Sequence, residues 1–272
     1  MTYDDSAKPG NQPVHRSVPS SSRRLYLLYH EICPQPDKYK YALEKARFRQ
    51  HLEFFSQARE QLSDWLWPEV TFDDGHVSNF EQALPLLSEF NINAHFFITV
   101  GWTSARPEYL GWTQIAGLQQ AGHRIGAHGW SHTLLTHCTD PQQLQTELND
   151  ARRRLEDSLS APITTMSLPG GRMNQRVLDA CRRAGYQQIF TSIPRSEIAE
   201  TASLIGRVNV RSDATIAWLE NLLRPNSNLL QRMERRYHLK HAAQIALGDR
   251  LYEKVWGILN RASHNAPVPD TR

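Results

Sequence analysis

Cysteine is scarce in this sequence, and its placement excludes two kinds of site. Cys33, Cys138 and Cys181 are an odd number of thiols, well separated along 272 residues. They form neither a disulfide framework nor a close pair able to hold a metal. We therefore expect a protein of a reducing compartment.

A concentrated run of basic residues is also absent. The formal net charge is +3, from 31 Lys and Arg against 28 Asp and Glu, and the basic residues are spread along the chain. Nucleic-acid-binding domains usually gather their basic residues in one patch or stripe. We therefore expect no nucleic-acid partner.

No apolar run approaches the length of about 20 residues that crosses a bilayer. Residues 1–24 are polar and rich in Ser and Pro, without the apolar centre of a secretory signal. We therefore expect a cytoplasmic protein with no transmembrane segment. If its substrate is attached to a membrane, the contact is peripheral.

Short apolar runs alternate with segments of helical periodicity. The predicted strands cover residues 25–30, 69–73, 94–100, 124–128, 163–168, 188–192 and 205–210. The predicted helices cover residues 48–62, 79–90, 113–121, 141–159 and 175–184. This alternation indicates parallel strands in an α/β sheet or barrel, and seven strands favour a (β/α) barrel, with functional residues at the carboxyl ends of the strands.

The chain divides into four predicted segments. Residues 1–23 and 263–272 are predicted to be disordered polar tails, and residues 24–212 to form the barrel. Residues 213–262 carry apolar residues at helical spacing, which predicts extra C-terminal helices packed on the outside of the barrel. The alternative is a helix that binds a partner or a membrane surface.

Two adjacent carboxylates follow the second predicted strand, in Val70-Thr71-Phe72-Asp73-Asp74-Gly75. Asp73 and Asp74 would point to opposite faces of a straight strand, so they reach one cavity only if the backbone bends, as Gly75 permits. Such a pair can provide a metal ligand and a base side by side. The alternative is a simple turn, because Asp-Gly is a strong turn signal.

His128 and His132 are four residues apart and can point the same way in a tight loop. With Asp74 they make a set of one oxygen and two nitrogens, which leaves positions open for water and substrate, as in a catalytic metal site. The alternative is a pair of surface histidines in a chain that has 12.

The order of these motifs resembles that of a known family. Thr71 to Gly75, Asn93-Ala94-His95-Phe96-Phe97-Ile98 and the run from Gly122 to His132 are similar to the motifs of the polysaccharide deacetylases of carbohydrate esterase family 4, the NodB-homology enzymes. The resemblance covers about residues 25–210. It implies a distorted (β/α) barrel.

The resemblance also implies an activity and roles. An enzyme of this kind removes N-acetyl groups from an amino sugar in a polysaccharide, oligosaccharide or lipid-linked glycan. Asp74, His128 and His132 would bind a divalent metal, with zinc expected and cobalt, nickel or iron compatible. Asp73 would be the general base. The alternatives are a deformylase or other amide hydrolase of the same superfamily, or a catalytically silent glycan-binding scaffold.

The general acid is displaced in the sequence. The family usually has a Leu-x-His motif late in the domain, whereas here Leu28-Tyr29-His30 lies in the first strand. This order is similar to the circularly permuted deacetylases that act on poly-N-acetylglucosamine. First and last strands of a barrel are neighbours, so we expect His30 to be the general acid. The alternative is a structural histidine.

Two further positions depart from the family pattern. Gly129 occupies the place of Ser or Thr, and the Arg-x-Pro-Tyr segment reads Ser167-Leu168-Pro169-Gly170-Gly171-Arg172. The arginine that tunes the base is therefore missing from its usual place, and Arg172 or Arg207 could approach from elsewhere. The residues expected to contact substrate are Trp130, Pro169, Gly170 and Arg172.

Other candidates carry weaker signals. His76 follows the Asp-Asp-Gly turn and either approaches the metal or is exposed. His95 lies within a predicted strand, where we expect a hydrogen-bonded structural histidine. Trp102 and Trp112 could stack on sugar rings, although only Trp130 has a sequence position between the two histidines.

Overall fold

The computed structural model describes residues 23–247 except 36, 62–64, 199–201 and 226. Residues 1–22, which make up most of the predicted N-terminal tail, lie outside the described part. So do residues 248–272, which include the predicted C-terminal tail and the end of the predicted helical segment. The boundaries of the four predicted segments therefore stay predictions.

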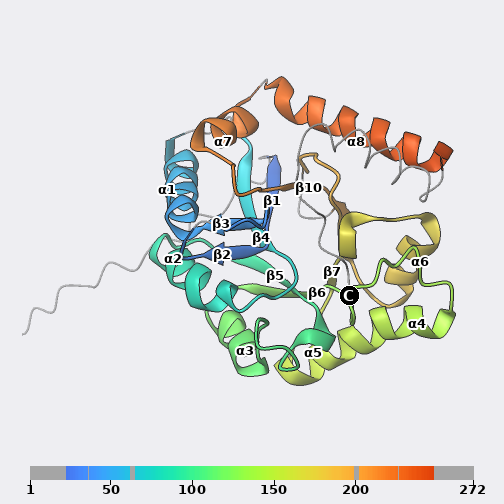
Figure 1. Ribbon diagram of the computed structural model, residues 1–272. Helices are drawn as coiled ribbons and strands as arrows, with labels where there is room; N and C mark the ends of the chain where they lie inside the picture. The colour runs from blue at the N-terminus through green and yellow to red at the C-terminus, as the bar shows by residue number, and fades with distance from the viewer. Residues whose placement is uncertain (1–22, 36, 62–64, 199–201, 226, 248–272) are drawn as a thin grey trace, which may run out of the picture.

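Parallel strands form the centre of the molecule (Figure 1). Within the described residues, one sheet contains eight strands in the order β10-β1-β4-β5-β6-β7-β8-β9. The strands are β1 (Arg24–Tyr29), β4 (Trp67–Phe72), β5 (Ala94–Ile98), β6 (Arg124–Ala127), β7 (Thr165–Ser167), β8 (Gln188–Phe190), β9 (Leu204–Ile205) and β10 (Arg207–Asn209). The predicted α/β barrel is confirmed, with eight strands instead of seven.

The additional strand comes from a bend at Gly206. β9 pairs with β8 and β10 pairs with β1, and Gly206 alone separates β9 from β10. The chain thus links the two ends of the sheet and closes the distorted barrel. A Cβ atom at position 206 would lie 2.6 Å from the carbonyl oxygen of Ile193, so the close approach at the bend requires glycine.

Two very short strands were not predicted from the sequence. β2 (Glu31–Cys33) and β3 (Ala42–Glu44) pair in parallel as a separate two-stranded sheet. They directly follow His30, and helix α1 begins immediately after β3. Unlike the equally short β7 and β8, they were not part of a predicted apolar run.

Helices surround the strands (Figure 1). All five helical segments predicted within the barrel are confirmed. They are α1 (Lys45–Gln61), α2 (Leu84–Glu89) with a preceding π-helical segment (Asn79–Ala83), α3 (Trp112–Gln120), α4 (Pro141–Gln145) joined to α5 (Ala151–Leu159) by a π-helical segment (Thr146–Asp150), and α6 (Gln175–Arg183).

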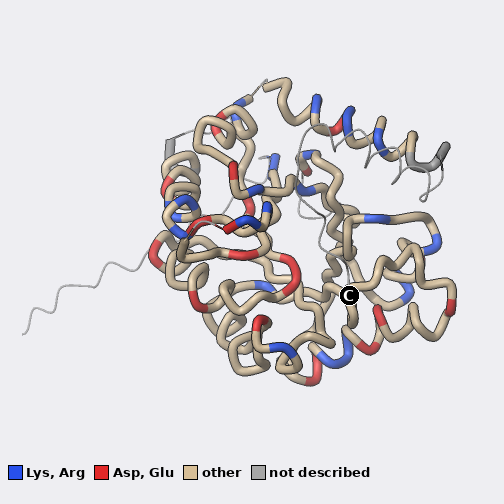
Figure 2. Tube along the Cα trace, viewed as in Figure 1, with Lys and Arg blue, Asp and Glu red and all other residues tan. Residues whose placement is uncertain are grey.

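Two helices follow the barrel. α7 (Ile216–Leu223) is buried along one face and packs against α1, whereas α8 (Asn228–Leu247) contacts the core through residues near its start. Leu239, farther along α8, is 71% exposed. Several basic residues follow the length of α8 (Figure 2).

The strands separate two apolar layers. Leu25, Leu27 and Tyr29 of β1 belong to the large cluster that includes the helices, whereas Tyr26 belongs to a small cluster with Phe97, Phe190 and Ile205. This alternation is typical of a barrel strand and identifies the small cluster as the barrel interior.

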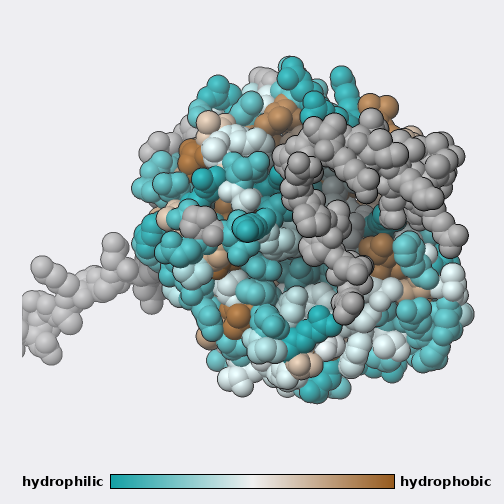
Figure 3. Space-filling model, viewed as in Figure 1, coloured by the Kyte–Doolittle hydropathy of each residue, from teal (hydrophilic) through white to brown (hydrophobic). Residues whose placement is uncertain are grey.

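No helix among the described residues is both long enough and apolar enough to cross a membrane. On the face seen in Figure 3, hydrophobic residues form small separate patches among hydrophilic ones.

Candidate functional site

The candidate residues gather at the carboxyl ends of β1, β4 and β6. His30, Asp73 and His128 each directly follow one of these strands. The pairing of Tyr29 with Phe72 brings His30 beside Asp73 at the ends of β1 and β4. This is the edge of the barrel where the sequence predicts functional side chains.

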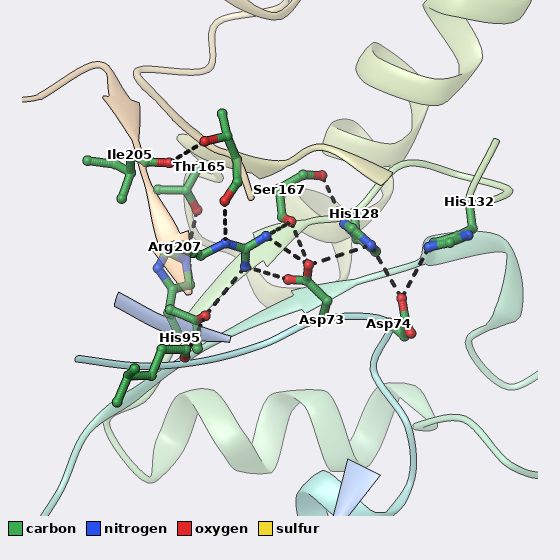
Figure 4. A network of polar contacts seen from close by, with 12 residues as sticks. Asp73, Asp74, His95, His128, His132, Thr165, Ser167, Ile205 and Arg207 are labelled. Carbon is green, nitrogen blue, oxygen red and sulfur yellow. Dashed lines mark hydrogen bonds and ion pairs between the residues drawn. The ribbon is translucent and has the colours of Figure 1, made fainter. Parts of the chain in front are cut away.

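A left-handed turn separates the two carboxylates. Asp74 has φ +73° and Gly75 has φ +78°, and the amide of Gly75 donates a hydrogen bond of 3.0 Å to the carbonyl of Asp73. Positive φ is strained for a residue other than glycine and is retained where the surroundings enforce it. The bend lets Asp73 face the barrel interior while Asp74 faces the histidines (Figure 4). The predicted turn therefore helps to build the site.

Asp74, His128 and His132 form a cluster suited to a divalent cation. The Oδ1 atom of Asp74 lies 3.3 Å from Nε2 of His128 and 3.3 Å from Nε2 of His132. One ligand atom from each residue lies within 4.8 Å of the other two. Asp74 Oδ1 is buried and makes no well-formed hydrogen bond within the described part of the chain, as expected of an atom that faces a cation.

The backbone fixes the tautomer of His128. Its Nδ1 lies 2.9 Å from the carbonyl oxygen of Ser167, which can only accept a hydrogen bond. Nδ1 therefore carries a proton, and neutral His128 presents the Nε2 lone pair to the cluster. The contact between Nδ1 and the Ser167 carbonyl thus orients the ring so that Nε2 faces the cluster, as a metal ligand requires.

The charges of the cluster are strongly coupled. Burial alone would raise the pKa of Asp74, but contacts with His128 and His132 hold that pKa well below its usual value. Burial lowers the pKa of His128, but Asp73 and Asp74 outweigh it and the pKa is raised. A bound cation would replace protons at such a site.

Arg207 holds Asp73 in a buried ion pair. Its Nη1 and Nη2 atoms lie 2.7 and 2.8 Å from the two carboxylate oxygens, and Ser167 Oγ donates to Oδ2 at 2.9 Å (Figure 4). Burial raises the pKa of Asp73, but the charge of Arg207 and its hydrogen bonds lower the pKa below its ordinary value. Asp73 is therefore ionised at neutral pH, as a general base requires.

Arg207 is itself fixed from several sides. Its Nε donates to the carbonyl of Thr191 at 3.1 Å and its Nη2 to Ser167 Oγ at 2.7 Å. The guanidinium lies 5.4 Å from the ring centre of Phe97 and 5.8 Å from that of Phe190. Of the two arginines weighed from the sequence, Arg207 is therefore the one that pairs with the predicted base.

His30 lies beside the carboxylates and against an aromatic ring. Its imidazole stacks on Tyr41 with 4.9 Å between ring centres, and Asn79 Nδ2 donates to its carbonyl at 2.7 Å. Its Nδ1 atom is buried and has no hydrogen-bond partner among the described residues. Burial lowers the pKa of His30, against the raising effect of Asp74 and Asp73. The acid role assigned to His30 stays a prediction.

Aromatic residues lie near the two histidines of the cluster. The ring of Trp102 lies 5.1 Å from that of His132, and Tyr109 lies 4.5 Å from Trp102. Trp130 instead lies over Gly101, where a Cβ atom would be 3.0 Å from the indole Nε1. The tryptophan whose ring lies against His132 is thus Trp102, whereas the sequence position favoured Trp130.

The segment that replaces the family's Arg-x-Pro-Tyr lies against the histidine loop. Pro169 is buried, and its Cγ would be 3.6 Å from a Cβ atom on Gly129. Gly170 is exposed and has φ +62°, whereas Arg172 is partly buried. Substrate contact by these residues, and by Trp130, stays a prediction.

The remaining candidates have structural partners. Buried His95 has Nε2 2.9 Å from Thr165 Oγ1, and burial lowers its pKa to about 3, so the expected structural role is supported. His76 has Nδ1 2.8 Å from Ser78 Oγ. Trp112 packs beneath the guanidinium of Arg154, 4.5 Å from the ring centre.

Two further residues emerge only from the structure. Ser167 contacts both Asp73 and Arg207, and Glu147 accepts hydrogen bonds from the loop between His128 and His132. Both are distant in sequence from the groups that they contact. The only local sign of either contact in the sequence was the glycine at position 129, where the family has Ser or Thr.

Comparison with known proteins agrees with the site. Residues 69–189 match the family model described as polysaccharide deacetylase. The YxkH protein of Bacillus subtilis is 32% identical over 125 residues, covering 46% of this chain and 44% of that protein. A peptidoglycan-N-acetylglucosamine deacetylase of Bacillus cereus is 30% identical over 124 residues, covering 45% and 55%. The matches thus span about half the length of these relatives.

Solved structures share the fold. The Streptococcus pyogenes deacetylase PplD in complex with acetate has a TM-score of 0.67 at 19% identity, covering 75% of this chain and all of that chain. IcaB from Ammonifex degensii has a TM-score of 0.61 at 21% identity, covering 74% and 96%. The matched motifs, the barrel and the Asp-His-His cluster agree with one another, and residues 69–189 of this chain are similar to the polysaccharide deacetylases.

Proposed function

We propose that the protein is a metal-dependent N-deacetylase of glycans that contain N-acetylated amino sugars. The observation that carries this proposal is the placement of a base beside the ligand cluster. Asp73 Oδ2 lies 3.8 Å from Nε2 of His128, whose ring also faces Asp74. Water near a cation held by the cluster would therefore lie close to an ionised carboxylate.

Zinc is the proposed metal, since one carboxylate and two imidazoles with open positions are typical of catalytic zinc sites. A cation there would polarise the amide carbonyl and acidify water. Asp73 accepts the proton of the attacking water, and Arg207 keeps that base ionised and oriented. Acetate and a free amine are the products.

The amine needs a proton, and we propose that His30 supplies it. This assignment depends on a permuted motif order, in which the acid lies on the first strand. β1 lies between β10 and β4 in the sheet, so His30 is adjacent to Asp73 despite its early position. Burial keeps its imidazole neutral at neutral pH, so His30 must gain a proton during the reaction. The proton that Asp73 takes from the attacking water must therefore reach His30 before the amine leaves.

Rings on both sides of the cluster suit a sugar substrate. Tyr41 stacks on His30, and Trp102 lies against His132. Aromatic faces provide apolar area for the faces of sugar rings. We propose that these residues, together with Trp130 and the Pro169 to Arg172 segment, position the glycan.

The test is acetate release from N-acetylglucosamine oligomers of increasing length by the zinc-loaded protein. We expect acetate from wild type, its loss in Asp73→Asn with zinc retained, and loss of both in Asp74→Asn. Zinc binding without acetate release from any N-acetylated glycan would contradict the proposal. Formate release from N-formyl analogues alone would identify a deformylase.

His30 requires its own variants. His30→Gln should retain zinc and lower the rate, whereas Tyr41→Phe, which keeps the stacked ring, should change the rate little. Wild-type activity in His30→Gln would exclude the permuted acid without affecting the deacetylase assignment.

A further inference from the structure

The loop between the two histidine ligands has an unusual backbone. Gly129 has φ +79° and His132 has φ +66°. The left-handed conformation is strained for histidine, and such strain persists only where surrounding contacts enforce it. The position of His132 as a ligand therefore depends on whatever holds this loop.

A buried carboxylate holds the amide groups of the loop. Glu147, which is 3% exposed, accepts hydrogen bonds from the amides of Trp130 at 2.7 Å and Ser131 at 3.0 Å. The hydroxyl of Ser131 donates to the other carboxylate oxygen. Glu147 lies in the π-helical segment Thr146–Asp150, a local distortion that is frequent near functional sites.

The carbonyl groups of the same loop are held from the opposite direction. The amide of Val100 donates to the carbonyl of Gly129 at 3.1 Å, and that of Gly101 donates to the carbonyl of Trp130 at 2.7 Å. A Cβ atom on Gly101 would lie 2.6 Å from the Trp130 carbonyl oxygen, so this approach also requires glycine. The loop is thus fixed between β5's end and the helix that carries Glu147.

Gly129 and Glu147 depend on each other. A Cβ atom at position 129 would lie 2.7 Å from Glu147 Oε2, well inside contact distance. The carboxylate reaches the amides of Trp130 and Ser131 because position 129 has no side chain. A side chain at position 129 would therefore disturb the hydrogen bonds that Glu147 accepts from the loop.

We propose that Glu147 is a positioning residue that sets the geometry and affinity of the metal site through the loop of Gly129, Trp130 and Ser131. It contacts backbone groups between two ligands, so it acts on the ligands and not on the substrate. The inference rests on the proposed metal site. Groups that orient ligands typically change metal affinity 10- to 100-fold when removed.

The test measures zinc affinity of the full chain by competition with a chromophoric chelator. Glu147→Ala should weaken zinc binding by about 10- to 100-fold, and Glu147→Gln, which keeps one acceptor oxygen, by less. The visible spectrum of the Co²⁺-loaded protein should change in Glu147→Ala, because ligand geometry changes. Recovery of zinc affinity and of the Co²⁺ spectrum in Glu147→Gln, compared with Glu147→Ala, would distinguish this role from loss of packing.

Glu156→Gln is a matched control. Glu156 accepts a hydrogen bond from the amide of Ile163 at 2.9 Å, so it also joins a helix to a loop, but away from the cluster. Glu156→Gln should leave zinc affinity and the Co²⁺ spectrum unchanged.

A double-mutant cycle tests the coupling. Gly129→Ala should weaken zinc binding more in wild type than in the Glu147→Ala background, where the carboxylate is absent. Should Glu147→Ala not fold, Ser131→Ala removes one donor to the carboxylate and should weaken zinc binding several-fold.

The outcomes separate the two proposals. Wild type that binds no divalent metal would overturn the proposed metal-dependent function. If wild type binds zinc and Glu147→Ala binds it with equal affinity, only the role of Glu147 is overturned. If Glu147→Ala does not fold, equal zinc affinity in Ser131→Ala has the same meaning.

Discussion

Replacement of Arg207 by methionine tests the assignment of Asp73 most directly. Arg207→Met removes both guanidinium contacts, at 2.7 and 2.8 Å, from a carboxylate that is 3% exposed. Ser167 Oγ still donates to Asp73 at 2.9 Å. The variant thus leaves a buried charge with one neutral hydrogen-bond donor.

Two estimates of the cost agree. Breaking a buried ion pair by removing one partner costs about 3–5 kcal/mol. An adjacent arginine lowers a carboxyl pKa by about 1–3 units, and each unit is about 1.4 kcal/mol, which gives about 1.4–4 kcal/mol. We expect Arg207→Met to lower the free energy of unfolding by about 3 kcal/mol at neutral pH, or Tm by about 6–12 °C.

The sign of the pH dependence follows from the pKa of Asp73. In wild type that pKa is lowered, so Asp73 contributes stability above its unfolded pKa and loses it as pH falls through the folded pKa. In Arg207→Met the uncompensated effect of burial raises the pKa. The stability difference should be largest at neutral pH and shrink as pH falls and Asp73 is protonated in the variant.

The assay is urea unfolding of the metal-free protein between pH 7 and pH 4. Arg207→Met combined with Asp73→Asn should recover part of the stability, since neither charge is then left unpaired. Additive losses in the double variant, or a loss below about 1 kcal/mol that does not vary with pH, would refute the assigned ion pair. In the metal-loaded enzyme, Arg207→Met should move the acidic limb of the rate profile to higher pH.

Three further predictions test the core, the barrel closure and the metal site. Burial lowers the pKa of His51 to about 4, so the free energy of unfolding should fall as pH drops from about 6.5 to 4. In urea unfolding, His51→Gln should flatten that fall, whereas His238→Gln, at an exposed position, should not. Gly206→Ala should lower stability by about 1–3 kcal/mol through its clash at the bend, whereas Gly111→Ala, with 3.5 Å to its nearest neighbour, should change stability by less than about 1 kcal/mol. Zinc at about 100 times its Kd should add about 2.7 kcal/mol of stability by thermal unfolding, and Asp74→Asn should remove this increment; no increment in wild type would contradict the metal site.

Much of the barrel could be predicted because its signals are local. Each strand of the barrel lies in a short apolar run, and two of the predicted ligands, Asp74 and His128, lie at or just after the end of such a run, where parallel strands place their carboxyl ends together. The sequence therefore placed Asp73, Asp74 and His128 near one edge of the barrel, whereas their predicted roles came from the family resemblance. The three-residue strands β2 and β3 lack such a signal.

Contacts between distant segments could not be assigned in the same way. Arg207 and Arg172 were equivalent candidates for the partner of Asp73, because sequence does not show which one enters the barrel. Glu147 lies at a polar position in a helical pattern, yet it is 3% exposed. Its burial depends on the missing side chain at Gly129, a relation that requires three-dimensional coordinates.

The direction from which Arg207 approaches explains how this chain tolerates the loss of the usual arginine segment. Arg207 reaches Asp73 from within the barrel, beside the paired rings of Phe97 and Phe190, and not from a loop above the strands. The loop that begins at Pro169 is then not needed to tune the base. It can differ in sequence, and accommodate a different glycan, without altering the ionisation of Asp73. The departure in this segment is therefore compatible with the proposed deacetylase activity, because the predicted base keeps an arginine partner.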